Sequence, residues 1–312
     1  MGYAVLFPGQ GSQFPGMGAD LFSHRRDLLG ERADQVLGWS LEEMCLEAPI
    51  EVLTRTEHAQ PAIFAVSFAL WDELASRLPV PPTAGAGHSL GEYTALAAAS
   101  VLSYDDALAL VAARGRAMAA AADAEPSGMA AVLGVTDEVA EEVAASRRRE
   151  GGRLYVANRN APGQVVLAGA VTDLEWLQRE ASALGLRRVI PLQVAGAFHT
   201  PFMAAAADSL RLTAEGMTFH PPTFPVYTNV SASPLPSVEG IAKTLHSQVV
   251  SPVLFAQSLS AMNRRGIGHF LHVGPGDVTA GLARKSVTDA ATFVVSDLAT
   301  IAPALDWLGT IG

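Results

Sequence analysis

A serine flanked by glycines, Gly87-His88-Ser89-Leu90-Gly91, is the segment of this chain best suited to chemistry. It fits the pattern G-x-S-x-G, in which a nucleophilic serine sits on a sharp turn between a strand and a helix. Small residues at 83–86 precede it and helix-forming residues at 92–99 follow it, as that turn requires. A helix beginning after Ser89 would bring backbone N–H groups close to its hydroxyl. The pattern predicts acyl transfer or ester hydrolysis through an acyl-serine, and a chance match in a loop is the alternative.

A serine hydroxyl needs a base, and His199 has the most suitable surroundings of the eight histidines. It lies in a loop of small residues, 194–200, after a predicted strand and before a helix that begins at Pro201. Sites of α/β proteins assemble in loops at the carboxyl ends of strands. The alternative is a histidine of a surface loop. We expect the neighbouring His88 to point away from the site and to support the turn.

Two further features would serve an acyl-enzyme. The glycine turn Gly9-Gln10-Gly11 follows the first predicted strand and can present one N–H group to an oxyanion, and Leu90, the residue after the nucleophile, supplies a second. Arg114 lies on an otherwise apolar helix of small residues, where burial requires an anionic partner such as a substrate carboxylate. An ordinary turn and an exposed arginine are the alternatives.

Composition excludes several classes of protein. The formal net charge of −10 argues against nucleic acid as the main partner. No apolar run reaches the ~18 residues of a membrane span, and the first residues lack the basic region of a signal peptide. Cys45 is the single cysteine, which excludes an intramolecular disulfide and a cysteine-based metal site. We therefore expect a cytoplasmic protein without a metal, nucleic-acid or membrane partner. We also expect a monomer that uses no cofactor.

The positive charge is unevenly distributed. Arg147, Arg148, Arg149 and Arg153 form a basic cluster, and smaller pairs stand at 264–265 and 284–285. Such runs are usually solvated surface. The cluster is also a candidate docking site for an acidic partner.

Strands and helices alternate along the chain, which predicts an α/β fold with a mainly parallel sheet. The predicted strands are 3–7, 83–88, 164–168, 188–192, 225–228 and 269–273. The predicted helices between them include 61–77, 104–120, 173–183 and 201–213.

Residues 127–194 have shorter elements, in the order strand, helix, strand, strand, helix, strand. This is the ferredoxin-like order. The segment begins after the turn-like residues 125–128. We therefore predict a large α/β domain formed by 1–126 and 195–312, with a small ferredoxin-like subdomain at 127–194 inserted in it.

Seven motifs, in order along nearly the whole chain, resemble one enzyme family. They are Gly9-Gln10-Gly11-Ser12-Gln13, Gly87-His88-Ser89-Leu90-Gly91-Glu92-Tyr93, Arg114-Gly115, the segments at 128–132 and 160–169, Gly196-Ala197-Phe198-His199 and Val273-Gly274-Pro275-Gly276. Together they are similar to the malonyl-CoA:acyl carrier protein transacylases. The resemblance includes both the free-standing enzyme of fatty acid synthesis and the acyltransferases of polyketide synthases.

The resemblance implies a hydrolase-like α/β core with a ferredoxin-like insert and a catalytic dyad of Ser89 and His199. In this family a backbone carbonyl, rather than a third acid, orients the histidine, and the matching position is Gln248. The partners that it implies are malonyl-CoA, as a substrate, and an acyl carrier protein.

The resemblance also assigns the remaining site residues. Backbone N–H groups of Gln10 and Leu90 would bind the oxyanion, and Arg114 would hold the malonyl carboxylate. Phe198 before the histidine and Leu90 after the serine would contact the α-carbon of the acyl group, a combination that in polyketide relatives accompanies malonyl rather than methylmalonyl. The segment at 196–199 departs mildly from those relatives, which often have histidine at its first position.

Three other functions compete with malonyl transfer. An acyl hydrolase of the same family would be expected to lack Arg114, and an unrelated esterase or lipase would need a third acid that the sequence does not reveal. An inactive module that docks carrier proteins would not need an intact Ser89 and His199. A transferase for a different acyl group also remains open.

Overall fold

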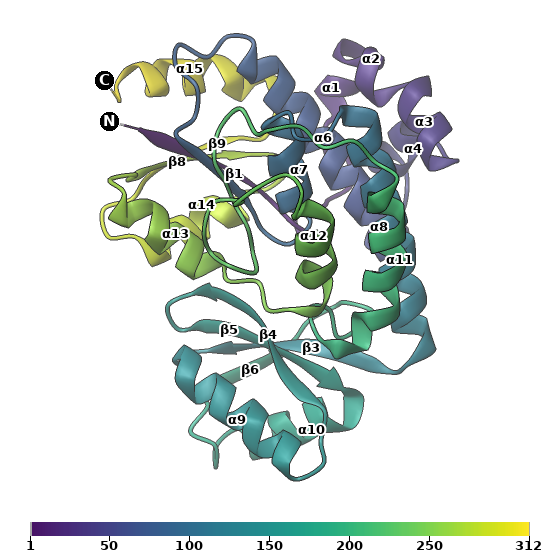
Figure 1. The fold of residues 1–312 in the computed structure, drawn as a ribbon, viewed down its shortest axis with the longest axis vertical. Coiled ribbons are helices and arrows are strands. Elements are labelled where there is room, and N and C mark those ends of the chain that lie inside the picture. The colour runs from purple at the N-terminus through teal and green to yellow at the C-terminus, as the bar shows by residue number, and fades with distance from the viewer. Residues whose placement is uncertain (1, 312) are drawn as a thin grey trace.

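Two separate sheets organise the chain in the computed structural model, which describes residues 2–311 (Figure 1). The larger sheet has five strands in the order β7-β2-β1-β8-β9, and all of its neighbours are parallel. Its strands are β1 (Tyr3–Phe7), β2 (Ala84–Gly87), β7 (Val226–Tyr227), β8 (His269–Val273) and β9 (Ala291–Val295). The predicted α/β fold with a mainly parallel sheet is confirmed.

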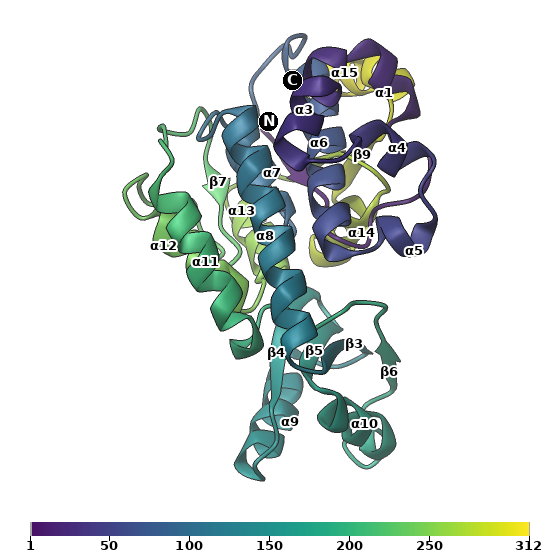
Figure 2. The same cartoon turned by 90° about the vertical axis from the view of Figure 1, so that its right-hand side faces the viewer.

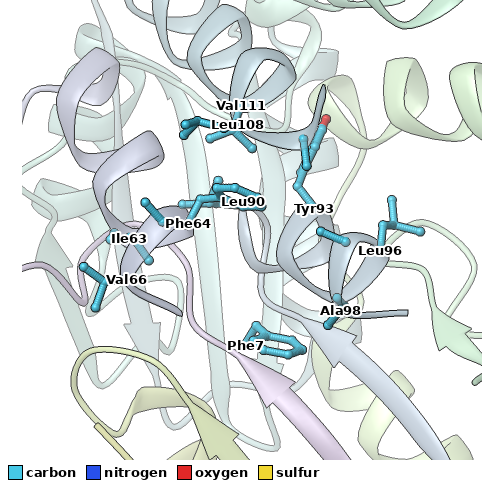
Figure 3. Packing of buried hydrophobic residues seen from close by; sticks show 14 of the residues in the cluster. Phe7, Ile63, Phe64, Val66, Leu90, Tyr93, Leu96, Ala98, Leu108 and Val111 are labelled. Atoms are coloured by element: carbon cyan, nitrogen blue, oxygen red, sulfur yellow. The ribbon is translucent and has the colours of Figure 1, made fainter. Parts of the chain in front are cut away.

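The central strand β1 is buried on both faces, as its unbroken apolar sequence requires. Tyr3, Val5 and Phe7 belong to one core cluster, whereas Ala4 and Leu6 belong to a second cluster behind the sheet. Figure 3 shows Phe7 close to side chains of two helices that cover the first face. Helices on both faces therefore fix the sheet, and the carboxyl ends of its strands form one edge at which loops can meet.

The helices and 3₁₀ turns of the larger part surround this sheet. They are α1 (Ala19–His24), α2 (Arg26–Leu29), α3 (Glu31–Leu37), α4 (Leu41–Leu46), α5 (Ile50–Leu53), α6 (Thr56–Ala75), α7 (Gly91–Ala98), α8 (Tyr104–Ala124), η1 (Pro201–Met203), α11 (Ala204–Glu215), α12 (Ile241–Val250), α13 (Phe255–Arg264), α14 (Val278–Ser286), η2 (Leu298–Thr300) and α15 (Ile301–Gly309). Within residues 2–311, no helix combines the length and the apolar character needed to cross a bilayer.

The smaller sheet is antiparallel, with the order β4-β5-β3-β6. Its elements are β3 (Ser127–Leu133), α9 (Asp137–Arg149), β4 (Leu154–Ala161), β5 (Gln164–Ala170), α10 (Val171–Glu180) and β6 (Arg188–Pro191). Numbered by themselves, the four strands lie in the order 2-3-1-4, which is the ferredoxin-like arrangement that the sequence predicted. All six elements fall within 127–194, the segment for which we propose a separate subdomain.

The small sheet lies between its own helices and the larger part of the molecule. In Figure 1, α9 and α10 lie on the side of the sheet away from the larger part. Figure 2 shows α8 running from the larger part to the small sheet, where β3 begins. The chain returns after β6 through the segment that contains His199. Both crossings between the two parts therefore bring candidate site residues to the space between the sheets.

Two elements differ from the prediction. Strand β9 was not predicted, and helix α6 begins at Thr56 rather than at 61, so that Pro61 lies inside it. Proline favours the first turn of a helix, which suggested a later start. In the structure Ala59 and Gln60 are fully buried, and the burial of this first turn offsets the hydrogen bond that Pro61 cannot donate.

Candidate active site

Ser89 lies on a strained turn between β2 and α7, with a φ of 52°. This left-handed conformation is uncommon for a residue with a side chain. The flanking glycines are needed for space: a Cβ on Gly87 would lie 1.8 Å from the carbonyl carbon of Gly91, and one on Gly91 would lie 2.2 Å from the oxygen of Phe7. The sequence pattern therefore forms the tight strand–turn–helix unit that it predicts.

The side chain of Asn229 holds this turn from both sides. Its Oδ1 accepts a hydrogen bond from the N–H of Ser89 at 2.8 Å, and its Nδ2 donates to the carbonyl of Gly87 at 2.7 Å. Asn229 is itself buried, and its own N–H donates to Glu92 Oε2 at 3.0 Å. The strained conformation of Ser89 is thus maintained by buried hydrogen bonds from a segment far away in the sequence.

His199 is in hydrogen-bond contact with Ser89. The Ser89 hydroxyl donates to Nε2 of His199 at 2.7 Å, and Nδ1 of His199 donates to the backbone carbonyl of Gln248 at 2.8 Å. A carbonyl can only accept, so the proton of the neutral ring is on Nδ1 and the lone pair of Nε2 faces the hydroxyl. Like Ser89, His199 has a positive φ, of 61°. The arrangement can remove a proton from Ser89.

The electrostatic environment keeps this histidine neutral. Burial and, to a smaller extent, the positive charge of Arg114 lower the pKa of His199 to about 3. A histidine with this pKa is in its basic form at every physiological pH. The ring is therefore unprotonated, and its Nε2 can accept the proton of the Ser89 hydroxyl.

Arg114 lies on α8 and is 1% exposed, with its guanidinium directed at the serine. Its Nη2 donates to Ser89 Oγ at 3.1 Å and to Gln248 Oε1 at 3.2 Å, and its Nη1 donates to Gln60 Oε1 at 2.6 Å. The guanidinium also lies over the ring of Tyr93, 5.1 Å from its centroid. Of the two interpretations of this arginine, the structure excludes the exposed one.

Two backbone N–H groups near Ser89 are available to an oxyanion. Leu90 stands at the N-terminus of α7, and Gln10 is part of the glycine turn after β1 and lines the same cleft as Ser89. Among residues 2–311, no hydrogen-bond acceptor is found for the N–H of either one. Such unpaired donors at a helix N-terminus suit a developing negative charge.

The cleft that contains Ser89 and His199 has a volume of about 240 Å³. Phe198 lines it, as expected, but the side chain of Leu90 does not. Leu90 is fully buried in the core, close to Phe64, Tyr93 and Leu108 (Figure 3). The prediction that its side chain meets the acyl group is therefore wrong. At this position the backbone N–H is open to the site, while the side chain faces the core.

Each arginine of the predicted basic cluster forms an ion pair with a carboxylate of the same chain. Arg147 pairs with Asp173 at 2.7 Å, and Arg148 pairs with Glu141 at 3.0 Å. The remaining two pairs are Arg149 with Glu142 and Arg153 with Glu125. The four arginines are not a free positive patch, and their role in docking an acidic partner stays a prediction.

Sequence reasoning missed several residues that the fold brings to the site. Three of them are buried. Asn229 contacts the turn around Ser89, Glu92 contacts Gln248, and Gln60 contacts Arg114. Glu92 follows the nucleophile motif directly, so its position was a usable signal. Gln60 and Asn229 carry no local pattern, because only tertiary contacts make them part of the site.

A comparison with models of protein families shows to which family this chain belongs. The model described as "Acyl transferase domain" matches residues 5–300. The chain belongs to the acyl transferase domain family. Ser89, His199 and Arg114 all lie within the matched residues of this acyl transferase.

Relatives of this acyl transferase have more specific names. It is 38% identical over 307 residues to the "Malonyl CoA-acyl carrier protein transacylase" of Bacillus subtilis (strain 168), over 98% of this chain and 96% of the relative. It is 36% identical over 286 residues to the "Polyketide biosynthesis malonyl CoA-acyl carrier protein transacylase PksC" of the same organism, over 91% and 97% of the two chains. The predicted family is confirmed.

A solved structure supports the fold. The malonyl-transacylase in a complex with its type II PKS acyl-carrier protein matches this acyl transferase with a TM-score of 0.92 at 34% identity, over 98% of this chain and 99% of that chain. The agreement extends over both sheets, and the expected architecture is confirmed.

The contacts of Asn229 lead to a prediction about stability. Asn229→Leu keeps a similar volume but leaves the N–H of Ser89 and the carbonyl of Gly87 without partners, and each buried unpaired group costs about 1–3 kcal/mol. We expect the free energy of unfolding in urea to fall by about 2–6 kcal/mol. Asn263→Leu, at an exposed position of α13, is the control and should unfold like the wild type. An unchanged midpoint for Asn229→Leu would show that the turn does not depend on this side chain.

Proposed function

We propose that this acyl transferase moves a malonyl group from malonyl-CoA to the phosphopantetheine thiol of an acyl carrier protein, through a malonyl-serine at Ser89. The observation that carries the proposal is the environment of Arg114. Its hydrogen-bond partners Gln60, Gln248 and Ser89 are uncharged, and its Nε has no partner. Among residues 2–311 it forms no ion pair with a carboxylate, and the buried Glu92, whose charge acts on it, makes no hydrogen bond with it. A buried cation beside a nucleophile calls for an anionic group on the substrate.

The position of Arg114 limits the size of that substrate. The guanidinium is 3.1 Å from Ser89 Oγ, so an acyl group on this oxygen can reach it with a carboxylate only one carbon beyond its own carbonyl. Malonyl has this arrangement. The planar guanidinium can bind both oxygens of the carboxylate.

The first half-reaction follows from the hydrogen bonds at Ser89. His199 takes the hydroxyl proton on Nε2 as Ser89 Oγ attacks the thioester carbonyl of malonyl-CoA. The N–H groups of Gln10 and Leu90 stabilise the oxyanion, each by about 3 kcal/mol. The tetrahedral intermediate then collapses, the C–S bond breaks, and the CoA thiolate leaves with the proton held by His199. The carbonyl of Gln248 accepts from Nδ1 throughout and stabilises the imidazolium.

The second half-reaction runs the same steps with a different thiol. His199 takes the proton of the phosphopantetheine thiol, and the thiolate attacks the carbonyl of the malonyl-serine. The tetrahedral intermediate then collapses, the bond between the carbonyl carbon and Ser89 Oγ breaks, and His199 returns the proton to Ser89 Oγ. A relative named for malonyl-CoA and acyl carrier protein, and a malonyl-transacylase solved with its acyl-carrier protein, support these two partners. Water competes with the thiol, and Arg114 limits hydrolysis by holding the malonyl group where the thiol can attack.

Phe198 lines the cleft directly before His199 and is 5% exposed. We infer that its ring fills the volume that an α-methyl group would need, which favours malonyl over methylmalonyl. A methyl group is worth about 1–3 kcal/mol in such a pocket. Because Leu90 does not line the cleft, Phe198 alone of the two predicted residues can supply this selectivity.

An acyl hydrolase on the same fold is the second candidate, since the dyad would serve hydrolysis equally well. Arg114 argues against it, because a hydrolase of neutral acyl chains has no use for a buried cation beside Ser89. The names of the relatives also favour transfer.

Mass spectrometry of the intact protein tests the nucleophile. Wild-type protein mixed with malonyl-CoA should gain the mass of one malonyl group, and Ser89→Ala should gain none. Ser12→Ala is a matched control, because Ser12 lines the same cleft and should not affect the adduct. A malonyl adduct on Ser89→Ala would show that another residue is acylated.

The choice of acyl group depends on Arg114. Arg114→Ala should raise the activation free energy of acylation by malonyl-CoA by roughly 2–5 kcal/mol, because the malonyl carboxylate is then buried without a partner. Acylation by acetyl-CoA should be affected far less. The preference for malonyl over acetyl should therefore disappear in competition experiments. Arg116→Ala, on an exposed position of the same helix, should keep it. If Arg114→Ala retained the malonyl preference, the carboxylate would bind elsewhere.

The pH dependence of acylation tests the environment of His199. Its pKa of about 3 means that the basic form predominates above that pH, so kcat/KM for acylation should be flat from about pH 5 to pH 8. With acetyl-CoA as the substrate, Arg114→Ala should move the inflection to higher pH, because the positive charge that lowers the pKa of His199 is lost. An inflection near pH 6.5 in the wild type would mean that His199 is solvated.

A further inference from the structure

Gln60 makes the shortest hydrogen bond to the cation beside the nucleophile. Its Oε1 accepts from Nη1 of Arg114 at 2.6 Å, whereas the bonds from Nη2 of Arg114 to Ser89 and Gln248 are 3.1 Å and 3.2 Å long. Gln60 is 0% exposed, belongs to the second turn of α6 and lines the cleft. A guanidinium only donates, so the amide oxygen must face Arg114. At this point Arg114 is therefore held by a neutral acceptor in a fixed orientation.

A chain of hydrogen bonds continues from Gln60 to the glycine turn after β1. Its Nε2 donates to Gln10 Oε1 at 3.4 Å, and Gln10 Nε2 donates to Thr56 Oγ1 at 3.2 Å. All of these bonds run in one direction, away from the cation, so its charge polarises each of them. The side chain that holds Arg114 thus also contacts Gln10, the residue whose backbone N–H we assign to the oxyanion.

Gly115 allows α8 to come close enough to α6 for this contact. A Cβ at position 115 would lie 3.0 Å from the carbonyl oxygen of Thr56 and 3.1 Å from Cα of Glu57. These distances are shorter than ordinary van der Waals contact, so a side chain there would push the first turn of α6 away from α8. The pair Arg114-Gly115 therefore places the cation against Gln60.

Gln248 also contacts Arg114, but it has further tasks. Its Nε2 donates to the carbonyl of Ser89 at 2.6 Å, and its backbone carbonyl accepts from His199. A change of this side chain would alter the dyad as well as the cation. Gln60 has no hydrogen bond with Ser89 or His199 in the described part of the chain. Position 60 is therefore the place where the surroundings of Arg114 can be changed without direct contact with the dyad.

His88 adds no charge near the cation. It lines the cleft, so the expectation that it points away from the site is wrong. Its Nε2 lies 2.7 Å from Oδ1 of Asn160, and its ring packs edge-on against Phe255, with the centroids 5.3 Å apart. Burial lowers the pKa of His88, so the ring is neutral.

We propose that Gln60 is a positioning residue that determines the charge of the acyl group which the site accepts. By holding Arg114 with a neutral oxygen, it keeps the guanidinium directed at Ser89 and leaves the positive charge to a substrate carboxylate. A carboxylate at position 60 would form a buried ion pair with Arg114, and the site would then favour uncharged acyl groups. The inference rests on the proposed function, because it assumes an acyl group that carries a carboxylate.

Replacement of Gln60 by glutamate tests the role of the neutral oxygen. Gln60→Glu is isosteric and puts a negative charge where the oxygen accepts from Arg114. In a competition between malonyl-CoA and acetyl-CoA, we expect the ratio of their kcat/KM values to fall at least about 100-fold, because the new carboxylate occupies Arg114 and repels that of malonyl. Gln35→Glu, at an exposed position of α3, adds the same charge and should keep the wild-type ratio. An unchanged ratio in folded Gln60→Glu would overturn the proposal.

A second substitution separates positioning from packing and does not depend on a new buried charge. Gln60→Met has a similar length but accepts no hydrogen bond from Arg114, so the ratio should fall about tenfold, the effect of one lost hydrogen bond. In an Arg114→Ala background the same substitution should leave the ratio unchanged, because its effect passes through Arg114. Equal losses with malonyl-CoA and acetyl-CoA, or a change of the ratio without Arg114, would make Gln60 a packing residue and refute its assigned role.

Failure of the proposed function would give a different result. If the wild type formed no malonyl-serine with malonyl-CoA, malonyl transfer and the role of Gln60 would both be excluded. If the wild type formed the malonyl-serine and Gln60→Glu kept the wild-type ratio, malonyl transfer would stand and only the role of Gln60 would fail.

Discussion

Gln248 connects the three side chains on which the chemistry depends. Its backbone carbonyl accepts from His199, its Nε2 donates to the carbonyl of Ser89 at 2.6 Å, and its Oε1 accepts from Arg114. Because Gln248 is completely buried at the end of α12, these contacts cannot be exchanged for water. Gln248 therefore holds the nucleophile, the base and the cation in fixed positions relative to one another, and the main-chain contact to His199 is independent of the identity of the residue at 248.

The buried charge of Arg114 explains the character of the site. It lowers the pKa of His199, although less than burial does, and so keeps the base neutral. It also leaves a positive charge with only neutral hydrogen-bond partners close to the reacting oxygen. Burial raises the pKa of Glu92 to about 7, which reduces the negative charge available to compensate Arg114. A site with this balance stabilises a negative charge brought by the substrate more than a neutral acyl group.

The two-sheet architecture makes the cleft. The larger sheet supplies the turn that carries Ser89, at the carboxyl end of β2. On the other side of the cleft, β4 and β5 of the small sheet supply the polar side chains of Asn158, Asn160 and Gln164. The contact between His88 and Asn160 joins these two parts directly. Residues of both sheets therefore form the walls of the cleft.

The sequence by itself predicted the features that depend on local geometry: the sharp turn around Ser89, the alternation of strands and helices, and the ferredoxin-like order of elements in 127–194. The need for glycine at 87 and 91 arises from contacts within one turn, so a short pattern identifies it. His199 and Arg114 could be selected because each is a chemically capable residue among small ones. The start of α6, the direction of the Leu90 side chain, and the roles of Asn229 and Gln60 depended on the tertiary structure. A hydrogen bond between residues 140 positions apart, such as that of Ser89 with Asn229, leaves no periodic or local signal, because the fold alone brings its partners together.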